Sequence, residues 1–264
     1  MPLVFAAVVP HSPVLIPSVG KEHLKKLKKT VAAMKRIEQE LYATHPDTIL
    51  IVSPHGAVEA DHFTLDLNEK YVCDLKDFGV FDVTVDCRAD MRLISALKEH
   101  LEDKGVPFML RSEPGLDYGV VVPLTYLAGH LKKYSVLPIY PSLLPAKSHF
   151  EFGQAIQEVL MHSDHRVAVI ASADLSHRLT RSAPAGYSPY GKKFDEKILT
   201  LIREKKYPAL LTFEPELAAK AAQCGLPPLT ILAGILDGID AAPEILSYES
   251  PFGIGLLTAH YAFA

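Results

Sequence analysis

The sequence predicts an α/β fold in which a mixed, partly parallel central β-sheet is flanked by helices. Short apolar runs typical of strands alternate along the chain with longer segments whose apolar residues recur every three or four positions. This alternation favours βαβ units over separate all-α and all-β halves. The 264 residues, 48% of them hydrophobic, can fill one large core, and we expect a single domain over residues 1–264.

The expected strands are short runs rich in β-branched and other apolar residues, and several of them end in Pro, Ser or Gly. The run at 81–86 alternates apolar with polar residues, as a half-buried strand does. The last run, at 253–262, is largely apolar and predicts a core strand. In chain order, strands are expected at 3–9, 48–52, 62–67, 81–86, 108–110, 136–140, 167–171, 244–248 and 253–262.

The expected helices follow from apolar spacing and from end signals. Between Leu24 and Leu41 the apolar residues share one helix face, while the opposite face carries several lysines diluted by glutamates. We interpret that charged face as solvated, although a phosphate or RNA contact is conceivable there. Gly105 is placed to end a helix in the left-handed conformation. In chain order, helices are expected at 24–41, 89–104, 124–131, 150–161, 192–204, 215–223 and 229–236.

Charge and cysteine usage narrow the class of partner. A net charge of −4 gives no general attraction to nucleic acid or to an anionic membrane, so we expect a small-molecule partner. Cys73, Cys87 and Cys224 form neither a CxxC pair nor a disulfide framework, which indicates a reducing cytoplasm and argues against a structural zinc site. No run approaches the roughly 20 apolar residues of a membrane span. Residues 1–16 are expected to form a first strand rather than a leader.

Four apolar runs each end at a residue that could bind or work beside a metal ion. These residues are His11, His55, His177 and Glu249. The carboxyl ends of strands in an open α/β sheet line one rim, where such folds place their sites. Two imidazoles and one carboxylate can hold divalent iron on one face and leave positions open for a substrate and dioxygen. His177 would then remain available for proton transfer.

Each of these residues also has a plainer interpretation. A histidine at a strand end is more often hydrogen-bonded in a loop than bound to a metal, although Pro10 and Pro54 would stiffen the loops that hold His11 and His55. Burying Glu249 would be costly without a cation or a donor, so a metal is one way to satisfy it. From the residues alone, a salt bridge or an exposed turn is the preferred interpretation of Glu249.

Two loops carry further reactive groups. Ser172, Asp174 and His177 suggest a hydrolase, but neighbours on one short loop rarely form a catalytic triad, and the chain has no GxSxG elbow. Asp174 could instead cap the following turn or orient His177. Tyr118, in a glycine-containing loop, could donate a hydrogen bond to a bound substrate or oxygen, or be a buried tyrosine tethered through its hydroxyl.

Taken together and in this order, the motifs resemble the class III extradiol ring-cleavage dioxygenases, the LigB-like superfamily. The resemblance covers nearly the whole chain and is carried by HSP at 11–13, SPHG at 53–56, GLDYG at 115–119, SADLSH at 172–177 and ESPFG at 249–253. Segments 183–191 and 224–226 look most like the branch found in AmmeMemoRadiSam proteins.

The resemblance implies that His11, His55 and Glu249 bind non-haem Fe(II), or zinc or another divalent metal in its place, and that His177 is the acid/base. Tyr118 stands where many relatives have a second active-site histidine. The implied activity is ring opening of a catechol or aminophenol with O2, and relatives commonly form homo-oligomers. Two competing functions stay open: a catalytically silent, Memo-like ligand-binding or interaction module, and a zinc-dependent hydrolase. The intact ligand set favours the enzyme.

Overall fold

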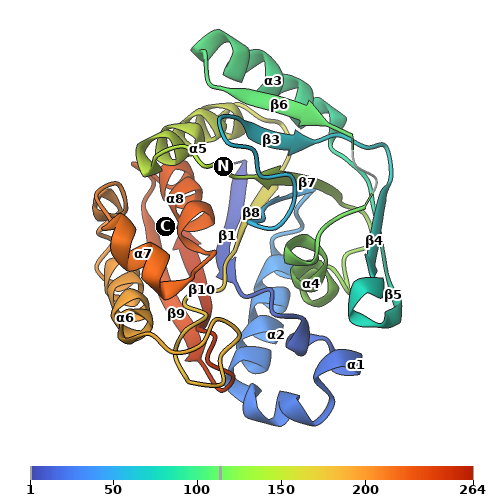
Figure 1. Cartoon of the computed structure of the whole chain (residues 1–264). Helices are drawn as coiled ribbons and strands as arrows, with labels where there is room; N and C mark the ends of the chain where they lie inside the picture. The colour runs from blue at the N-terminus through green and yellow to red at the C-terminus, as the bar shows by residue number, and fades with distance from the viewer. Residues whose placement is uncertain (1, 113–114, 264) are drawn as a thin grey trace.

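Eight strands form one sheet through the middle of the molecule (Figure 1). The structure is a computed structural model that describes residues 2–112 and 115–263, apart from the side chains of 82–86. The strand order is β6-β3-β7-β2-β8-β1-β10-β9. The bounds are β1 (Leu3–Val9), β2 (Thr48–Val52), β3 (Phe63–Asp66), β6 (Phe108–Arg111), β7 (Ser135–Tyr140), β8 (Val167–Ser172), β9 (Ala241–Glu249) and β10 (Leu256–Phe263).

The centre of this sheet is parallel. Strands β7, β2, β8 and β1 run in one direction, and the antiparallel pairs β3–β7, β1–β10 and β10–β9 extend the sheet on either side. Buried parallel strands read as continuous apolar runs, and all five residues of β2 are indeed buried. The predicted mixed, partly parallel sheet flanked by helices is therefore confirmed.

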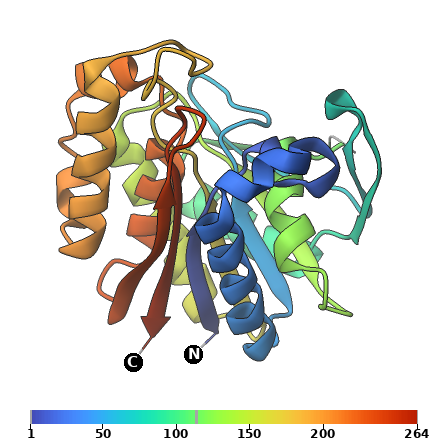
Figure 2. The same cartoon turned by 90° about the horizontal axis from the view of Figure 1, so that it is seen from below.

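Helices cover both faces of the sheet (Figure 2). Two separate hydrophobic clusters result, one on each face. Successive side chains of a strand point to opposite faces, so Ala6 and Val8 of β1 join one cluster while Phe5, Ala7 and Val9 join the other. The first cluster packs against α3 (Met91–Lys104), α5 (Ala146–Met161), α6 (Pro189–Arg203) and α8 (Leu226–Ile235), and the second against α2 (Lys28–Ala43) and α4 (Tyr118–Leu127).

In the described part of the chain, no helix combines the length and apolar character needed to cross a bilayer.

A small hairpin stands apart from the main sheet. Strands β4 (Tyr71–Leu75) and β5 (Val80–Cys87) pair antiparallel around the short 3-10 helix η3 (Lys76–Phe78). Gly79 ends η3 with φ 71°, a conformation that glycine adopts without strain. The hairpin lies beside α4 at the edge of the molecule (Figure 1).

Most predicted elements are present, with shifted ends. The helix expected over 24–41 divides at Leu27 into a 3-10 helix (Lys21–Lys26) and α2. The helix expected at 124–131 instead begins at Tyr118 and ends at Leu127, with Asp117 as its N-cap. Its apolar residues lie all around the axis and Pro123 sits inside it, so it lacks the periodicity that reveals a surface helix. The strand β4 was not predicted.

Helices α5 and α8 pack so closely that two glycines form the contact. A Cβ atom on Gly234 would lie 2.1 Å from the carbonyl oxygen of Phe150, and one on Gly153 would lie 2.2 Å from that of Ile231. Both obstacles are backbone atoms, which cannot rotate out of the way.

Gly234→Ala should therefore lower the free energy of unfolding by about 1–3 kcal/mol through overpacking, as urea denaturation would measure. Gly129→Ala is the matched control, because no atom lies within 4 Å of a Cβ placed there, and it should change stability by less than about 0.5 kcal/mol. Equal urea midpoints for the two variants would contradict the close α5–α8 contact.

Candidate metal centre

Three predicted site residues follow three adjacent parallel strands. The order β2-β8-β1 places these strands side by side, and their parallel register brings their carboxyl ends to the same edge of the sheet. His11 follows β1, His55 follows β2 and His177 follows β8. This edge is where open α/β sheets carry their sites.

The imidazoles of His11 and His55 face each other. Their Nε2 atoms are 3.0 Å apart, and the rings meet edge to face with centroids 4.7 Å apart. Nδ1 of His11 lies 2.9 Å from Oγ of Ser172, whose own hydroxyl donates to the carbonyl of Gly119. Ser172 Oγ must then accept a hydrogen bond from Nδ1–H, which leaves a lone pair on Nε2 of His11.

Both rings are held in the neutral form. Burial lowers the pKa of His11 to about 3, and the charge of nearby His177 adds to this effect. Burial likewise lowers the pKa of His55 to about 3, with His11 and His177 as further causes. A neutral imidazole is the form that binds a metal, so both residues are ready ligands near neutral pH.

A third donor comes from Cys224, in the turn between α7 (Pro215–Ala221) and α8. Its Sγ lies 3.5 Å from Nε2 of His11, and the donor atoms of His11, His55 and Cys224 all lie within 4.8 Å of one another. A Cβ atom on Gly225 would be 2.7 Å from the carbonyl oxygen of Asp174. Glycine is thus required for this turn to approach the β8 loop.

These three donors fit a divalent metal ion. Two imidazole nitrogens that lie 3.0 Å apart can both bind the same ion, each at about 2.1 Å, which is the usual length of a metal–imidazole bond. Burial raises the pKa of the Cys224 thiol, and the charge of Asp174 raises it further. The sulfur therefore keeps its proton until a cation displaces it.

Glu249 does not join the two histidines, contrary to prediction. It is the last residue of β9, and its Oε2 accepts hydrogen bonds from the backbone N–H of Thr30 at 2.7 Å and from the Thr30 hydroxyl at 2.8 Å. Thr30 lies in the first turn of α2, where unpaired N–H groups attract a carboxylate. Its Oε2 is already satisfied there, and Cys224 occupies the place expected for the carboxylate. The expected ligand set is therefore not intact, and it no longer favours the enzyme over a silent binding module.

Asp174 and His177 lie beside the imidazole pair. The Oδ1 atom of Asp174 accepts a hydrogen bond from the backbone N–H of His11 at 3.1 Å, and its Oδ2 is 3.7 Å from His11 Nε2. Burial raises the pKa of Asp174, which the nearby His177 opposes. Among the described residues, the Nδ1 atom of His177 is buried and has no hydrogen-bond partner.

Tyr118 also lies at the centre, and a cavity opens beside it. Its ring stacks on His55 with centroids 4.5 Å apart. His55 and Tyr118 line a cavity of about 550 Å³ that continues under the β4–β5 hairpin, where Phe78 contacts Tyr118 with ring centroids 5.3 Å apart. A bound molecule could therefore reach His55 from this cavity.

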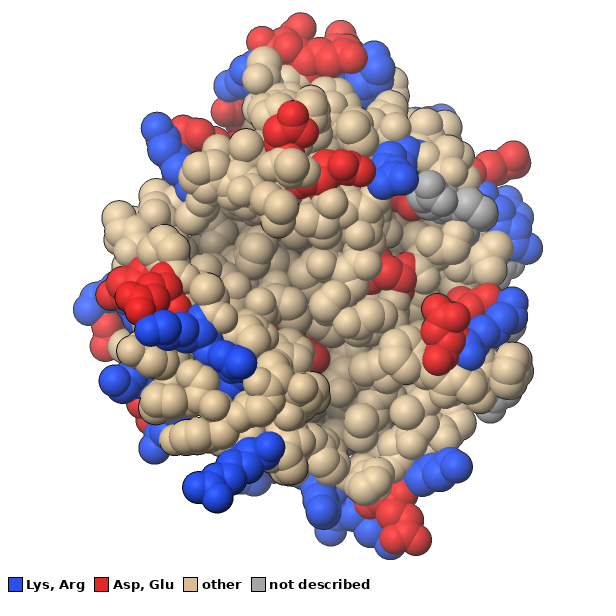
Figure 3. Space-filling model, in the orientation of Figure 1, with Lys and Arg blue, Asp and Glu red and all other residues tan. Residues whose placement is uncertain are grey.

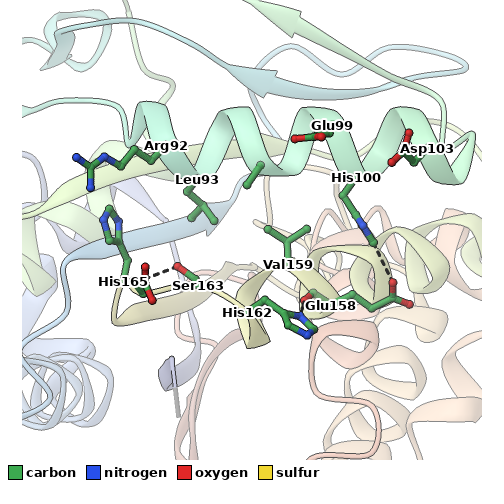
Figure 4. Close-up of a pocket in the computed structure, with 12 residues that line it drawn as sticks. Arg92, Leu93, Glu99, His100, Asp103, Glu158, Val159, His162, Ser163 and His165 are labelled. Atoms are coloured by element: carbon green, nitrogen blue, oxygen red, sulfur yellow. Dashed lines mark hydrogen bonds and ion pairs between the residues drawn. The ribbon is translucent and has the colours of Figure 1, made fainter.

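Another cavity, of about 700 Å³, lies between α3 and α5 and is not this site (Figure 4). Its residue His165 precedes β8, which puts it at the amino end of the parallel strands. There His100 pairs with Glu158 at 2.9 Å, as Figure 4 shows, and His165 pairs with Asp90 at 2.7 Å. These histidines are engaged with carboxylates rather than grouped around a common point.

A family model described as the catalytic LigB subunit of aromatic ring-opening dioxygenase matches residues 5–259. The chain belongs to the LigB family. LigB dioxygenases are metal-dependent, which agrees with the cluster of donor atoms at the sheet edge.

Individual relatives of this LigB-family chain are distant. It is 29% identical over 257 residues to Protein CA_C1420 of Clostridium acetobutylicum, covering 94% of this chain but only 55% of that protein, so it spans about half of the relative's length. It is 26% identical over 235 residues to the 3,4-dihydroxyphenylacetate 2,3-dioxygenase of Escherichia coli, covering 82% of this chain and 83% of that enzyme.

The fold is also found among solved structures. The uncharacterized protein JW3007 from Escherichia coli K12 superposes with a TM-score of 0.67 at 18% identity, covering 98% of this chain and all of that one.

Sequence reasoning missed Cys224 as a donor. As a possible ligand it was judged only against CxxC spacing and disulfide pairing, and a single cysteine in a turn passes neither test. The available signal was the Cys224-Gly225 pair within the segment 224–226. Cysteine followed by a residue without a Cβ is compatible with a turn pressed against another loop.

Asp195 of α6 supports the loop that carries His177. Its Oδ1 accepts a hydrogen bond from the backbone N–H of Ser176 at 2.8 Å, and its Oδ2 accepts one from the Tyr248 hydroxyl at 2.6 Å. Burial raises the pKa of this carboxyl to about 6. The pKa of Asp195 in the folded protein thus lies above its value in the unfolded chain, which is near 4. The stabilising contribution of Asp195 is therefore complete at low pH, and it is lost as the pH rises through about 6.

The parent protein should therefore lose stability between pH 5 and pH 8, whereas Asp195→Asn should not, since asparagine does not ionise. The free energy of unfolding of Asp195→Asn minus that of the parent should rise by about 1 kcal/mol over this range. Urea unfolding of both proteins at the two pH values would measure the difference. A pH-independent difference would show that Asp195 has an ordinary pKa in the folded protein.

Proposed function

We propose that the protein is a metal-dependent extradiol dioxygenase, which opens the ring of a catechol or aminophenol with O2. The observation that carries the proposal is the pair of neutral imidazoles facing each other at 3.0 Å, with a thiol beside them, at the edge of the sheet where a cavity opens. The family match and the dioxygenase relatives support the same reaction class.

In this proposal His11, His55 and Cys224 hold the metal, with Fe(II) as the expected ion. When bound, the metal supplies adjacent positions for the two substrate oxygens and for dioxygen, and it favours loss of the substrate's hydroxyl protons. The Nδ1–H···Ser172 hydrogen bond fixes the tautomer and the orientation of His11. Asp174 holds the His11 backbone, and so sets where the ring projects.

His177 moves the proton. A substrate hydroxyl next to this ring can transfer its proton to a ring nitrogen and recover it later, which is the usual role of an imidazole in general acid–base catalysis. The position of the ring supports this assignment, because His177 is close enough to His11 and His55 to lower the pKa of both. Tyr118, stacked on His55, would donate a hydrogen bond from its hydroxyl to a substrate oxygen as negative charge develops.

One observation favours a second function, a zinc-dependent hydrolase. Cysteine thiolate is a softer ligand than carboxylate, and histidine–cysteine sets are common around zinc. Cys224 therefore makes zinc a reasonable occupant, in which case a bound water would be the nucleophile. Metal analysis of protein purified without oxygen separates the two functions, together with oxygen uptake on a panel of catechols and aminophenols. Zinc with no oxygen uptake would favour the hydrolase, and iron without uptake on any substrate would favour a silent binding module.

Cys224→Ala should lower metal affinity by more than about tenfold, because it removes a direct ligand, as metal titration under anaerobic conditions would show. Glu249→Gln is the control: its carbonyl oxygen can still accept from Thr30, and metal affinity should stay within about twofold. If Cys224→Ala binds the metal normally and Glu249→Gln loses metal affinity, Glu249 rather than Cys224 is the ligand.

His177→Ala should bind the metal normally and lose oxygen uptake by about 100-fold or more, the usual contribution of a general acid–base group. Both quantities can be measured on the same preparation. If His177→Ala loses its metal in proportion to its activity, His177 is a ligand rather than the proton carrier.

A further inference from the structure

The carboxyl group of Asp117 has no part in the proposed chemistry, yet several donors converge on it. Asp117 is the N-cap of α4, and its Oδ1 accepts hydrogen bonds from the Ser53 hydroxyl at 2.6 Å and from the Gly119 N–H at 2.7 Å. Tyr140 donates to the same carboxyl. These partners are all uncharged. In Figure 3 the Lys and Arg side chains lie mostly toward the outline of the molecule, and the centre of the face is hollowed. Asp117 therefore acts through hydrogen bonds to neutral groups.

One arm of this hydrogen-bond network reaches His55. Ser53 directly follows β2, and its side chain is fully buried. Its hydroxyl proton goes to Asp117, so a lone pair of Ser53 Oγ is left for the backbone N–H of His55, which donates to it at 3.3 Å. Asp117 thus fixes the direction of the hydroxyl that holds the backbone of one metal ligand.

The other arm reaches His11 through Gly119. The N–H of Gly119 donates to Asp117, and its carbonyl accepts from the Ser172 hydroxyl. Oγ of Ser172 in turn accepts from Nδ1 of His11 at 2.9 Å. A Cβ atom on Gly119 would lie 2.3 Å from Ser53 Oγ and 2.8 Å from Asp117 Oδ1. The two arms therefore meet at a contact that has room only for glycine.

The same cap also places Tyr118, which stands between Asp117 and Gly119 in the chain. The Tyr118 ring stacks on His55 with centroids 4.5 Å apart, and it meets the His11 ring edge to face at 5.8 Å. The beginning of α4 is therefore in contact with both histidine rings, and Asp117 is the residue that holds this end of the helix in place.

We propose that Asp117 is a positioning residue of the metal centre, which orients both histidine ligands through Ser53 and Gly119. The inference rests on the metal centre of the proposed function and adds the residue that aligns its ligands. Without the Asp117 carboxyl, the Ser53 hydroxyl and the first turn of α4 each lose an acceptor. The two imidazoles are then no longer held at the spacing that one ion needs. Groups that orient metal ligands in this way typically contribute about 10- to 100-fold to metal affinity.

Asp117→Ala should weaken the binding of Co2+ by about tenfold or more. An anaerobic titration that follows the visible absorption of the bound ion measures this affinity. The absorption bands should also shift, because they report the arrangement of the ligands around the ion. Asp117→Asn should bind Co2+ within about threefold of the parent protein, since its carbonyl oxygen still accepts from Ser53 and Gly119, although these hydrogen bonds lose the assistance of the charge.

Ser53→Ala tests the same network with a smaller change, and it carries the test if Asp117→Ala does not fold. Alanine fills nearly the same space but offers no acceptor to the His55 N–H and no donor to Asp117. This variant should also bind Co2+ more weakly than the parent protein, and its absorption bands should shift.

The opposite end of β2 supplies matched controls. Asp90 is the N-cap of α3, and it accepts hydrogen bonds from the Leu93 N–H and from the hydroxyl of Thr48, the first residue of β2. Asp90→Ala and Thr48→Val therefore remove the same kinds of hydrogen bond at the amino end of the strand. Their urea midpoints should fall as those of Asp117→Ala and Ser53→Ala do, while their Co2+ affinity and absorption bands should equal those of the parent protein.

The outcomes separate positioning from stability and from the reaction. If Asp117→Ala and Ser53→Ala lose stability but bind Co2+ as the parent protein does, with the same bands, Asp117 is a helix cap alone and the inference is overturned. Equal losses of affinity in Asp117→Asn and Asp117→Ala would overturn it too, because hydrogen bonding would not be the cause. These measurements need neither oxygen nor a catechol, so a parent protein that binds Co2+ and, loaded with iron, opens no ring contradicts the proposed function alone. A parent protein that binds no Co2+ would contradict both.

Discussion

The contact between the imidazole rings of His11 and His55 is the constraint on which the site depends. The two nitrogens are 3.0 Å apart, one on the buried His11 ring and one on the partly buried His55 ring. They repel each other if both present lone pairs, and two positive rings would repel more strongly. One proton or one cation between them removes that conflict. Because burial lowers the pKa of both rings to about 3, the protein keeps them neutral and available to a metal.

The fold maintains this contact by anchoring each ring to a different strand. His11 and His55 follow β1 and β2, and β8 lies between those strands. Ser172, the last residue of β8, bridges His11 Nδ1 to the Gly119 carbonyl at the start of α4. The orientation of the His11 ring is thus set by a side chain of β8 and a backbone carbonyl of α4, which are elements of regular structure.

The sequence was sufficient for those parts of the site that local patterns specify. β-branched runs reveal strands, and the rule that parallel strands end at one edge brings His11, His55 and His177 together without knowledge of the fold's details. Cys224 and Glu249 were beyond such reasoning, because each is placed by long-range packing. Cys224 reaches the site only because Gly225 allows its turn to touch the β8 loop. Glu249 ends an edge strand whose neighbour, α2, supplies donors that no local pattern reveals.

Replacing a carboxylate by a thiolate changes the chemistry of a metal site without changing its charge. A divalent ion with two neutral imidazoles and one thiolate keeps one net positive charge, as it would with glutamate, so an ionised diol is attracted there in either case. What the thiolate would change is the softness of the ligand set, because sulfur favours a softer ion than a carboxylate oxygen does. The presence of Cys224 beside His11 and His55 would therefore act on which metal the centre retains rather than on the charge of the centre.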